Sequence, residues 1–220
     1  MKVQTKLIKI ATLTVMSGLL ATSALAQNSE IEVGALGLIS DYTSLNVANG
    51  PAAGNVGPGL GFSGGFVLGQ MMSNRWGGEV RYLYFKNDLD LTSGGQSASF
   101  GAQSHAVHYD ALYYLSRPDA RIRPYVAVGG GLKYFQGTGT EDPFQPLSNL
   151  ALLTKTSQAK PAGDFGVGVK FRVGNRMMFR VEFRDYITGV PDRVIAASPG
   201  AQITGILHHL VPLFGFSYTF

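Results

Sequence analysis

The sequence lacks cysteine altogether, which excludes a disulfide framework and any metal site built on thiolates. Charged residues are also sparse, at 15% of the chain. Beyond residue 26, no apolar run reaches the length of about 18 residues that a transmembrane helix needs. No segment combines the apolar period of a helix with helix caps. Stability must therefore come from burial and β pairing, within a chain long enough for one domain.

The N-terminal segment has the features of a secretory signal peptide. Three lysines (Lys2, Lys6, Lys9) precede an apolar stretch over residues 10–20, and a small-residue cleavage pattern ends at Ala26. A retained membrane anchor is the alternative. Without these lysines, 15 basic residues face 14 acidic ones, so the high overall pI does not indicate a nucleic-acid partner. We expect an exported protein with a signal peptide at 1–26 and one domain at 27–220.

In the remaining sequence, apolar residues alternate with polar or small residues, with a period of two. EVRYLYF (79–85), GDFGVGVKFRV (163–173), FRVEFR (179–184) and LFGFSYTF (213–220) all alternate, and stretches rich in Gly, Asn, Asp, Ser and Pro separate such segments. The fold class indicated is all-β. The pattern predicts eight strands at 30–39, 58–69, 76–86, 104–115, 122–135, 161–173, 177–186 and 207–220.

The connections between these strands alternate between short and long. The long ones span residues 40–57, 87–103, 136–160 and 187–206. This asymmetry is typical of an outer-membrane barrel, which has short periplasmic turns and long external loops. We therefore expect an eight-stranded antiparallel up-and-down transmembrane β-barrel in an outer membrane, with four mobile external loops. A soluble sandwich or lipocalin-like barrel is the alternative.

The cost of arginine in lipid decides which face points inwards. In FRVEFR, Arg180, Glu182 and Arg184 alternate with apolar residues, and each arginine facing mid-bilayer would cost about 2–4 kcal/mol. The charged face must therefore line the lumen, so we expect Val181→Arg to destabilise the fold more than Glu182→Gln. The same parity predicts a lumen ion-pair network of Glu32, Glu79, Arg81, Asp110, Lys133, Asp164, Lys170, Arg172, Arg180, Glu182 and Arg184. Five acids against six bases in a narrow barrel favour a packed interior over a water channel.

Aromatic residues near the predicted turn ends of the strands form a second pattern. They would lie at one level and make an interfacial girdle in contact with outer-membrane lipid. The girdle residues are Trp76, Tyr113, Phe171, Phe179 and Phe220.

Several of these segments resemble one protein family. The terminal alternation, RVEFRDY (180–186), RPYVAVGGGLKY (123–134) and HYDALYYL (108–115) are similar to small outer-membrane barrels of the OmpA and OmpX type. The resemblance covers residues 27–220. It implies a structural role or a surface interaction through the external loops, with a ligand that the loops do not identify. It also implies that the barrel assembly machinery reads the last strand, through Gly215, Phe216, Tyr218 and Phe220.

The motifs that suggest chemistry are incomplete. Residues 59–64 fit GxGxxG, but further glycines and the turn at 73–75 prevent a following helix, so we expect no cofactor. Some related barrels deacylate lipid A with a histidine and a serine two residues apart, whereas Leu210 and Val211 follow His208 and His209.

His108 and Asp110 share the lumen-facing parity, but no serine shares that face at membrane depth, so we expect the pair to belong to the lumen network. A metal site built from the four histidines would need strands far apart around the barrel. We expect no catalytic, cofactor or metal residues. The alternatives are a lipid A-modifying enzyme and a small-solute channel.

Overall fold

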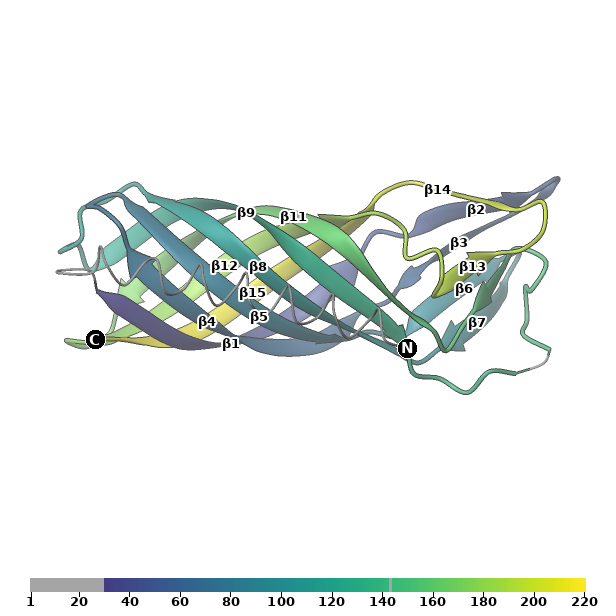
Figure 1. Cartoon of the computed structure of the whole chain (residues 1–220), viewed down its shortest axis with the longest axis horizontal. Helices are drawn as coiled ribbons and strands as arrows, with labels where there is room; N and C mark the ends of the chain where they lie inside the picture. Colours follow the sequence, from purple (N-terminus) through teal and green to yellow (C-terminus); the bar gives the residue numbers. More distant parts are fainter. Residues whose placement is uncertain (1–29, 143) are drawn as a thin grey trace, which may run out of the picture. The chain divides into compact units, whose positions relative to one another are not determined.

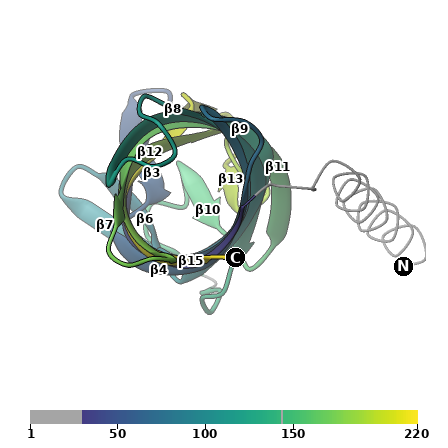
Figure 2. The same cartoon turned by 90° about the vertical axis from the view of Figure 1, so that its left-hand side faces the viewer.

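Eight long strands close into a barrel in the computed structural model, which describes residues 30–142 and 144–220. They are β1 (Ile31–Tyr42), β4 (Gly61–Met71), β5 (Trp76–Lys86), β8 (Ala102–Tyr114), β9 (Ile122–Gly137), β11 (Ser157–Arg172), β12 (Met177–Thr188) and β15 (Leu207–Thr219). All neighbours pair antiparallel, and β1 closes the barrel against β15 (Figures 1 and 2). The all-β prediction and the eight-stranded barrel are confirmed. The predicted signal peptide lies outside the described residues.

The strand limits follow the alternation and the turn residues. β5 spans the predicted 76–86, whereas β11 begins at Ser157, four residues before its predicted start. The connections at 72–75, 115–121 and 173–176 are short and lie at one end of the barrel, which we call the turn end. The GxGxxG segment leads into strand β4 rather than a helix. In the described part of the chain, no helix is long and apolar enough to cross a membrane.

The barrel is polar inside and apolar outside. On β12, Arg180 and Arg184 are fully buried, while the intervening Phe183 leaves 49% of its surface exposed. Phe214 on the neighbouring strand β15 is likewise 50% exposed. A water-soluble barrel buries its apolar side chains inside, so this outward apolar surface is the arrangement expected of a barrel in lipid.

The four long connections carry seven further strands. β2 (Leu45–Asn49), β3 (Ala52–Pro58), β6 (Leu89–Ser93), β7 (Gln96–Phe100) and β14 (Gln202–Thr204) form one sheet in the order β14-β2-β3-β6-β7, and β10 (Ala151–Leu153) pairs with β13 (Ile195–Ala197). We call residues 43–60, 87–101, 138–156 and 189–206 the outer cap, and its end of the barrel the cap end. Figure 1 shows these strands at the opposite end from the C-terminus.

The outer cap has its own apolar core. Its most buried side chains, each at most 2% exposed, are Leu45, Val47, Val56, Leu89, Leu91, Leu150, Ala151, Leu153, Val194 and Ile195. Tyr42 and Phe135, at the ends of β1 and β9, belong to the same cluster and join the cap to the barrel mouth. We expected four mobile loops from their polar composition. That expectation missed the scattered apolar residues, which no single loop could bury alone but which four loops together enclose.

Polar contacts also tie the cap to the barrel. Asp192, in the connection after β12, accepts hydrogen bonds from Gln158 and, at 3.0 Å, from Lys160 of β11. The hydrogen bonds from Gln158 and then Lys160 hold the pKa of the Asp192 carboxyl below its ordinary value. The cap is therefore attached to the barrel through both its apolar core and these polar contacts.

Replacing Val181 with arginine tests the outward face. Val181 of β12 lies between Val169 of β11 and Phe214 of β15. In lipid vesicles, Val181→Arg should lower the free energy of unfolding by about 2–4 kcal/mol, because the new charge faces hydrocarbon. Urea titration measures the change. The control Ala48→Arg, on an exposed position of cap strand β2, should change it by less than about 0.5 kcal/mol. Equal effects of the two variants would contradict the assignment.

Candidate functional site

The lower part of the lumen, nearer the turn end, is organised around Glu79 of β5. Its carboxylate accepts hydrogen bonds from Arg81 (2.7 Å), Lys170 (2.8 Å) and Arg180 (2.9 Å). Lys170 of β11 also binds Glu32 of β1 at 2.6 Å, and Arg180 of β12 contacts the same carboxylate. Four strands therefore meet through one chain of ion pairs, because each inward cation reaches two carboxylates.

A second centre, Glu182 of β12, lies next to the first. Arg81 approaches it at 2.8 Å, Arg184 at 2.9 Å and Arg180 at 3.0 Å. The side chains of all four residues are fully buried. We expected Glu182→Gln to cost less than Val181→Arg because it would weaken one charge pair. Glu182 pairs with three guanidinium groups, so the count of one pair is wrong and the smaller cost no longer follows.

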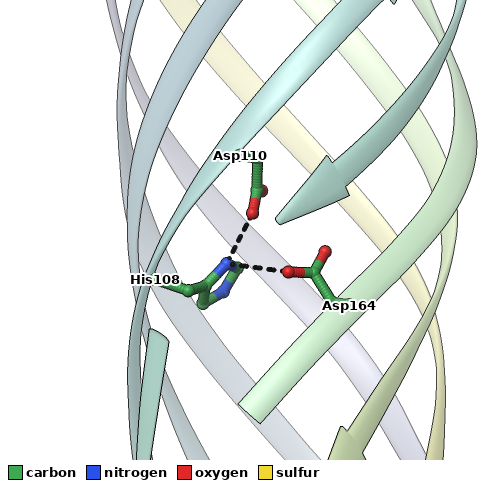
Figure 3. A group of neighbouring side chains, drawn as sticks. All are labelled: His108, Asp110 and Asp164. Atoms are coloured by element: carbon green, nitrogen blue, oxygen red, sulfur yellow. Dashed lines mark hydrogen bonds and ion pairs between the residues drawn. The ribbon is translucent and has the colours of Figure 1, made fainter. Parts of the chain in front are cut away.

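The third part of the lumen joins His108 and Asp110 of β8 to Asp164 of β11 (Figure 3). His108 Nδ1 lies 2.8 Å from Asp110 Oδ1 and 3.5 Å from Asp164 Oδ1. Arg184 binds Asp164 at 2.7 Å, and Arg81 binds Asp110 at 3.0 Å. The two carboxylates converge at Gly129 of the intervening strand β9, on the position that the Cβ of any other residue would occupy. Glycine there allows the close approach.

This cluster has the donor types of a metal site but also close cationic neighbours. One ligand atom from each of the three residues lies within 4.8 Å of the others. The two arginines, however, already neutralise both carboxylates, and a divalent cation would be repelled by them. We assign no metal to the cluster.

Charges inside the lumen are nearly balanced without an added ion. We call the following set the lumen network: Glu32, Glu79, Arg81, His108, Asp110, Asp164, Lys170, Arg180, Glu182 and Arg184. It holds five carboxylates and four cations, and the His108 ring lies against two of the carboxylates. The sequence-based expectation that His108 belongs with Asp110 to the lumen network rather than to a catalytic site agrees with these contacts.

Two predicted members lie elsewhere. Lys133 of β9 is fully buried, but it forms no ion pair with any described residue. Its ammonium lies 2.7 Å from His209 Nδ1, and 4.3 Å and 4.7 Å from the ring centroids of Phe85 and Tyr42. Arg172 is only half-buried and donates to the Pro118 carbonyl at 2.8 Å. The prediction was wrong for both residues because alternation determines the face of a strand and not the depth along it.

The last strand presents its aromatic residues outwards. Phe216 and Phe220 leave 58% and 69% of their surfaces exposed, and the rings of Tyr218 and Phe220 are 4.9 Å apart. Gly215 faces inwards, where a Cβ would lie 2.9 Å from Arg180 Cγ. Its lack of a side chain leaves room for the arginine. Recognition of this strand by an assembly machinery stays a prediction.

The structure brings the predicted girdle residues together in separate groups. Trp76 and Tyr113 are paired in register, with ring centroids 5.0 Å apart. Phe171 and Phe179 are likewise paired, at 6.2 Å, and Phe216 extends this group at 4.9 Å from Phe179. All of them lie within a few residues of the turn end, at the start or the end of their strands.

Sequence reasoning missed a polar pair on the outer surface near the cap end. His208 Nδ1 of β15 lies 2.7 Å from Asp185 Oδ2 of β12, and the His208 side chain is 41% exposed. The two residues are 23 positions apart, and only the β12–β15 register brings them together. The sequence showed only that both residues lie on the outward face of their strands. It did not show that the two strands are neighbours or how they are aligned.

Removing the charge of Glu182 tests the lumen network. Glu182→Gln should cost about 3–5 kcal/mol, because it leaves three buried guanidinium groups short of one negative charge. Urea titration of the protein in lipid vesicles measures the loss. Asp88→Asn removes a carboxylate from the exposed pair with Lys86, 3.5 Å apart, and should cost less than about 1 kcal/mol. A loss for Glu182→Gln no greater than this control would mean that the network contributes little to stability.

Two solved outer-membrane proteins share the fold of this chain. Neisserial surface protein A aligns with a TM-score of 0.54 at 12% identity, over 86% of this chain and 97% of that one. A major outer membrane protein from Thermus thermophilus aligns with a TM-score of 0.50 at 12% identity, over 88% and 100%. The N-terminal barrel domain of Pseudomonas aeruginosa OprF aligns with a TM-score of 0.49 at 14% identity, over 87% and 97%.

At such identities the structural similarity shows the fold alone. A comparison with curated proteins finds no match. The family model described as outer membrane protein beta-barrel domain matches residues 12–206. The predicted resemblance to small outer-membrane barrels is thereby confirmed, and the chain belongs to the outer membrane protein beta-barrel domain family.

Proposed function

We propose that this protein is an integral outer-membrane barrel with a closed lumen, and that its role is structural or interactive rather than catalytic. The observation that carries the proposal is the mutual pairing inside the lumen. Arg81, Arg180 and Arg184 are fully buried, and each of them binds two or more carboxylates. Ionisable groups engaged in this way are not available to conduct solutes or to act on a substrate.

The contacts above the lumen network support closure at the cap end. Lys133 lies among aromatic rings and His209, so the interior there is filled by side chains. The apolar core of the outer cap begins next to these side chains, because Tyr42 and Phe135 of the barrel strands belong to it. In this proposal a surface partner would meet the outer cap as a folded surface, and its chemical class stays open.

The proposal also includes export and assembly. A signal peptide at 1–26 would direct the chain across the inner membrane, and the barrel assembly machinery would read the last strand. The position of Phe220 supports this, since its backbone N–H donates to the Ile31 carbonyl at 2.9 Å, where β15 meets β1 to close the barrel. The turn end would then face the periplasm and the cap end the exterior.

Conductance measurements test the closed lumen. Reconstituted in planar bilayers, the folded protein should show no large, stable, porin-like conductance, because the side chains of eight strands fill the bore. Heat-modifiable electrophoretic mobility verifies folding of the same sample. Regular appearance of such channels in folded protein would overturn the closed-lumen model in favour of a small-solute channel.

A lipid A-modifying enzyme is the second candidate, and one observation favours it. The Asp185–His208 pair faces outwards at the cap end, where the outer leaflet would lie, and a carboxylate that orients a histidine is one part of a hydrolytic site. The missing part is a nucleophile. The hydroxyl of Thr43 lies close, but it is engaged with the His208 backbone at 3.1 Å.

Mass spectrometry of lipid A separates the two candidates. Cells that overexpress the protein should contain lipid A of unchanged mass under our proposal. A mass shift that His208→Gln abolishes, while the variant still inserts normally, would establish the enzyme instead. Asp41→Asn, another exposed change near the same rim, serves as the matched control.

A further inference from the structure

The two ends of the barrel carry opposite charge. Within residues 31–220, the turn end holds six arginines, Arg75, Arg117, Arg121, Arg123, Arg172 and Arg176, against one acid, Asp119, a net charge of +5. The cap end holds seven acids, Asp41, Asp88, Asp90, Glu141, Asp142, Asp185 and Asp192, against four bases, Lys86, Lys155, Lys160 and Arg193, a net charge of −3. The lumen charges cancel between these ends. The nearly neutral domain is therefore strongly polarised along the chain's strands.

Most of the turn-end arginines are available to a ligand. Arg123 is buried beneath the others, with its guanidinium 4.0 Å from the Tyr114 ring centroid. We call the remaining five the arginine rim: Arg75, Arg117, Arg121, Arg172 and Arg176. Within residues 30–142 and 144–220, none of the five forms an ion pair. The hydrogen bonds of the rim guanidinium groups go to two carbonyls and a tyrosine hydroxyl, which leave their charge uncompensated.

One part of the rim borders an open hollow of about 390 Å³. The hollow is formed where β9, β11 and β12 reach the turn end, and two arginines and four apolar residues line it: Arg121, Ile122, Phe171, Arg172, Val173 and Phe179. Ile122 and Val173 leave 53% and 56% of their surfaces exposed. Phe171 and Phe179 belong to the outward aromatic group, so the apolar wall of the hollow continues into the outer surface of the barrel.

We propose that this hollow binds an anionic phospholipid of the periplasmic leaflet, with the headgroup phosphate at Arg121 and Arg172 and the start of an acyl chain along Ile122 and Phe179. A guanidinium group offers paired N–H donors that match phosphate oxygens. The apolar wall favours a lipid over a soluble phosphate, which would leave the wall in water. The uncompensated charge of the rim favours an anionic lipid over a zwitterionic one. The proposal rests on the membrane location proposed above.

Lipid selectivity of the full chain, folded into vesicles of phosphatidylcholine with a minor share of phosphatidylglycerol, tests the site. Spin-labelled lipids report the relative association of each lipid with the barrel. The wild type should prefer phosphatidylglycerol, and Arg121→Gln should reduce this preference by about fivefold, the expected effect of one basic residue near a membrane surface. Arg121→Lys keeps the charge without the paired donors, so it should fall between the two. Lys155→Gln removes the same charge at the cap end and should leave the preference unchanged.

Arg121 is the deciding position because its side chain is exposed, whereas Arg172 also binds the Pro118 carbonyl and could disturb the turn. Failure of the wild type to insert, judged by heat-modifiable mobility, would contradict the membrane proposal itself. Normal insertion without a preference for phosphatidylglycerol, or an equal loss in Lys155→Gln, would overturn the lipid site alone. Displacement of the labelled lipid by soluble glycerophosphate at the same concentration would also overturn it, because the apolar wall would then contribute nothing.

Discussion

The structure depends on the need to neutralise arginine inside a barrel whose outer face is apolar. A guanidinium group taken out of water is stable only when carboxylates surround it with good geometry. Glu79 and Glu182 meet this need from neighbouring positions, since each of them binds three cations. Because the cations come from β5, β11 and β12, and Glu32 adds β1, the ion pairs also hold opposite walls of the barrel in one register. Glycine gives these groups room: Gly215 lies against the Arg180 side chain, and Gly129 lies against the carboxylates of Asp110 and Asp164.

Above the lumen network the principle of stabilisation changes from charge to apolar burial. Lys133 marks the transition, since its ammonium is surrounded by aromatic rings and an imidazole rather than by carboxylates. The outer cap then adds a core of aliphatic side chains that belongs to no single loop. A barrel with this second core presents a folded surface at the cap end. Any partner recognised there would meet fixed strands, which lowers the entropy cost of binding compared with disordered loops.

The groups that remain free for function lie on the outside of the barrel. Inside the lumen the carboxylates and cations bind one another. The two ends of the barrel differ from the lumen. Among the described residues, the arginine rim has no acidic partner at the turn end, and near the cap end the Asp185–His208 pair leaves its histidine side chain 41% exposed. Both lie beside strands whose apolar side chains face outwards.

The sequence by itself determined the number of barrel strands, the faces of these strands and the alternation of short and long connections, because these follow from local periodicity and from the cost of arginine in hydrocarbon. Only the tertiary structure decided the partners. It placed Lys133 among aromatic rings and paired Asp185 with His208. It also assembled the outer cap from residues in four separate connections. Depth and pairing depend on the register between strands distant in sequence, and a period of two is the same at every depth.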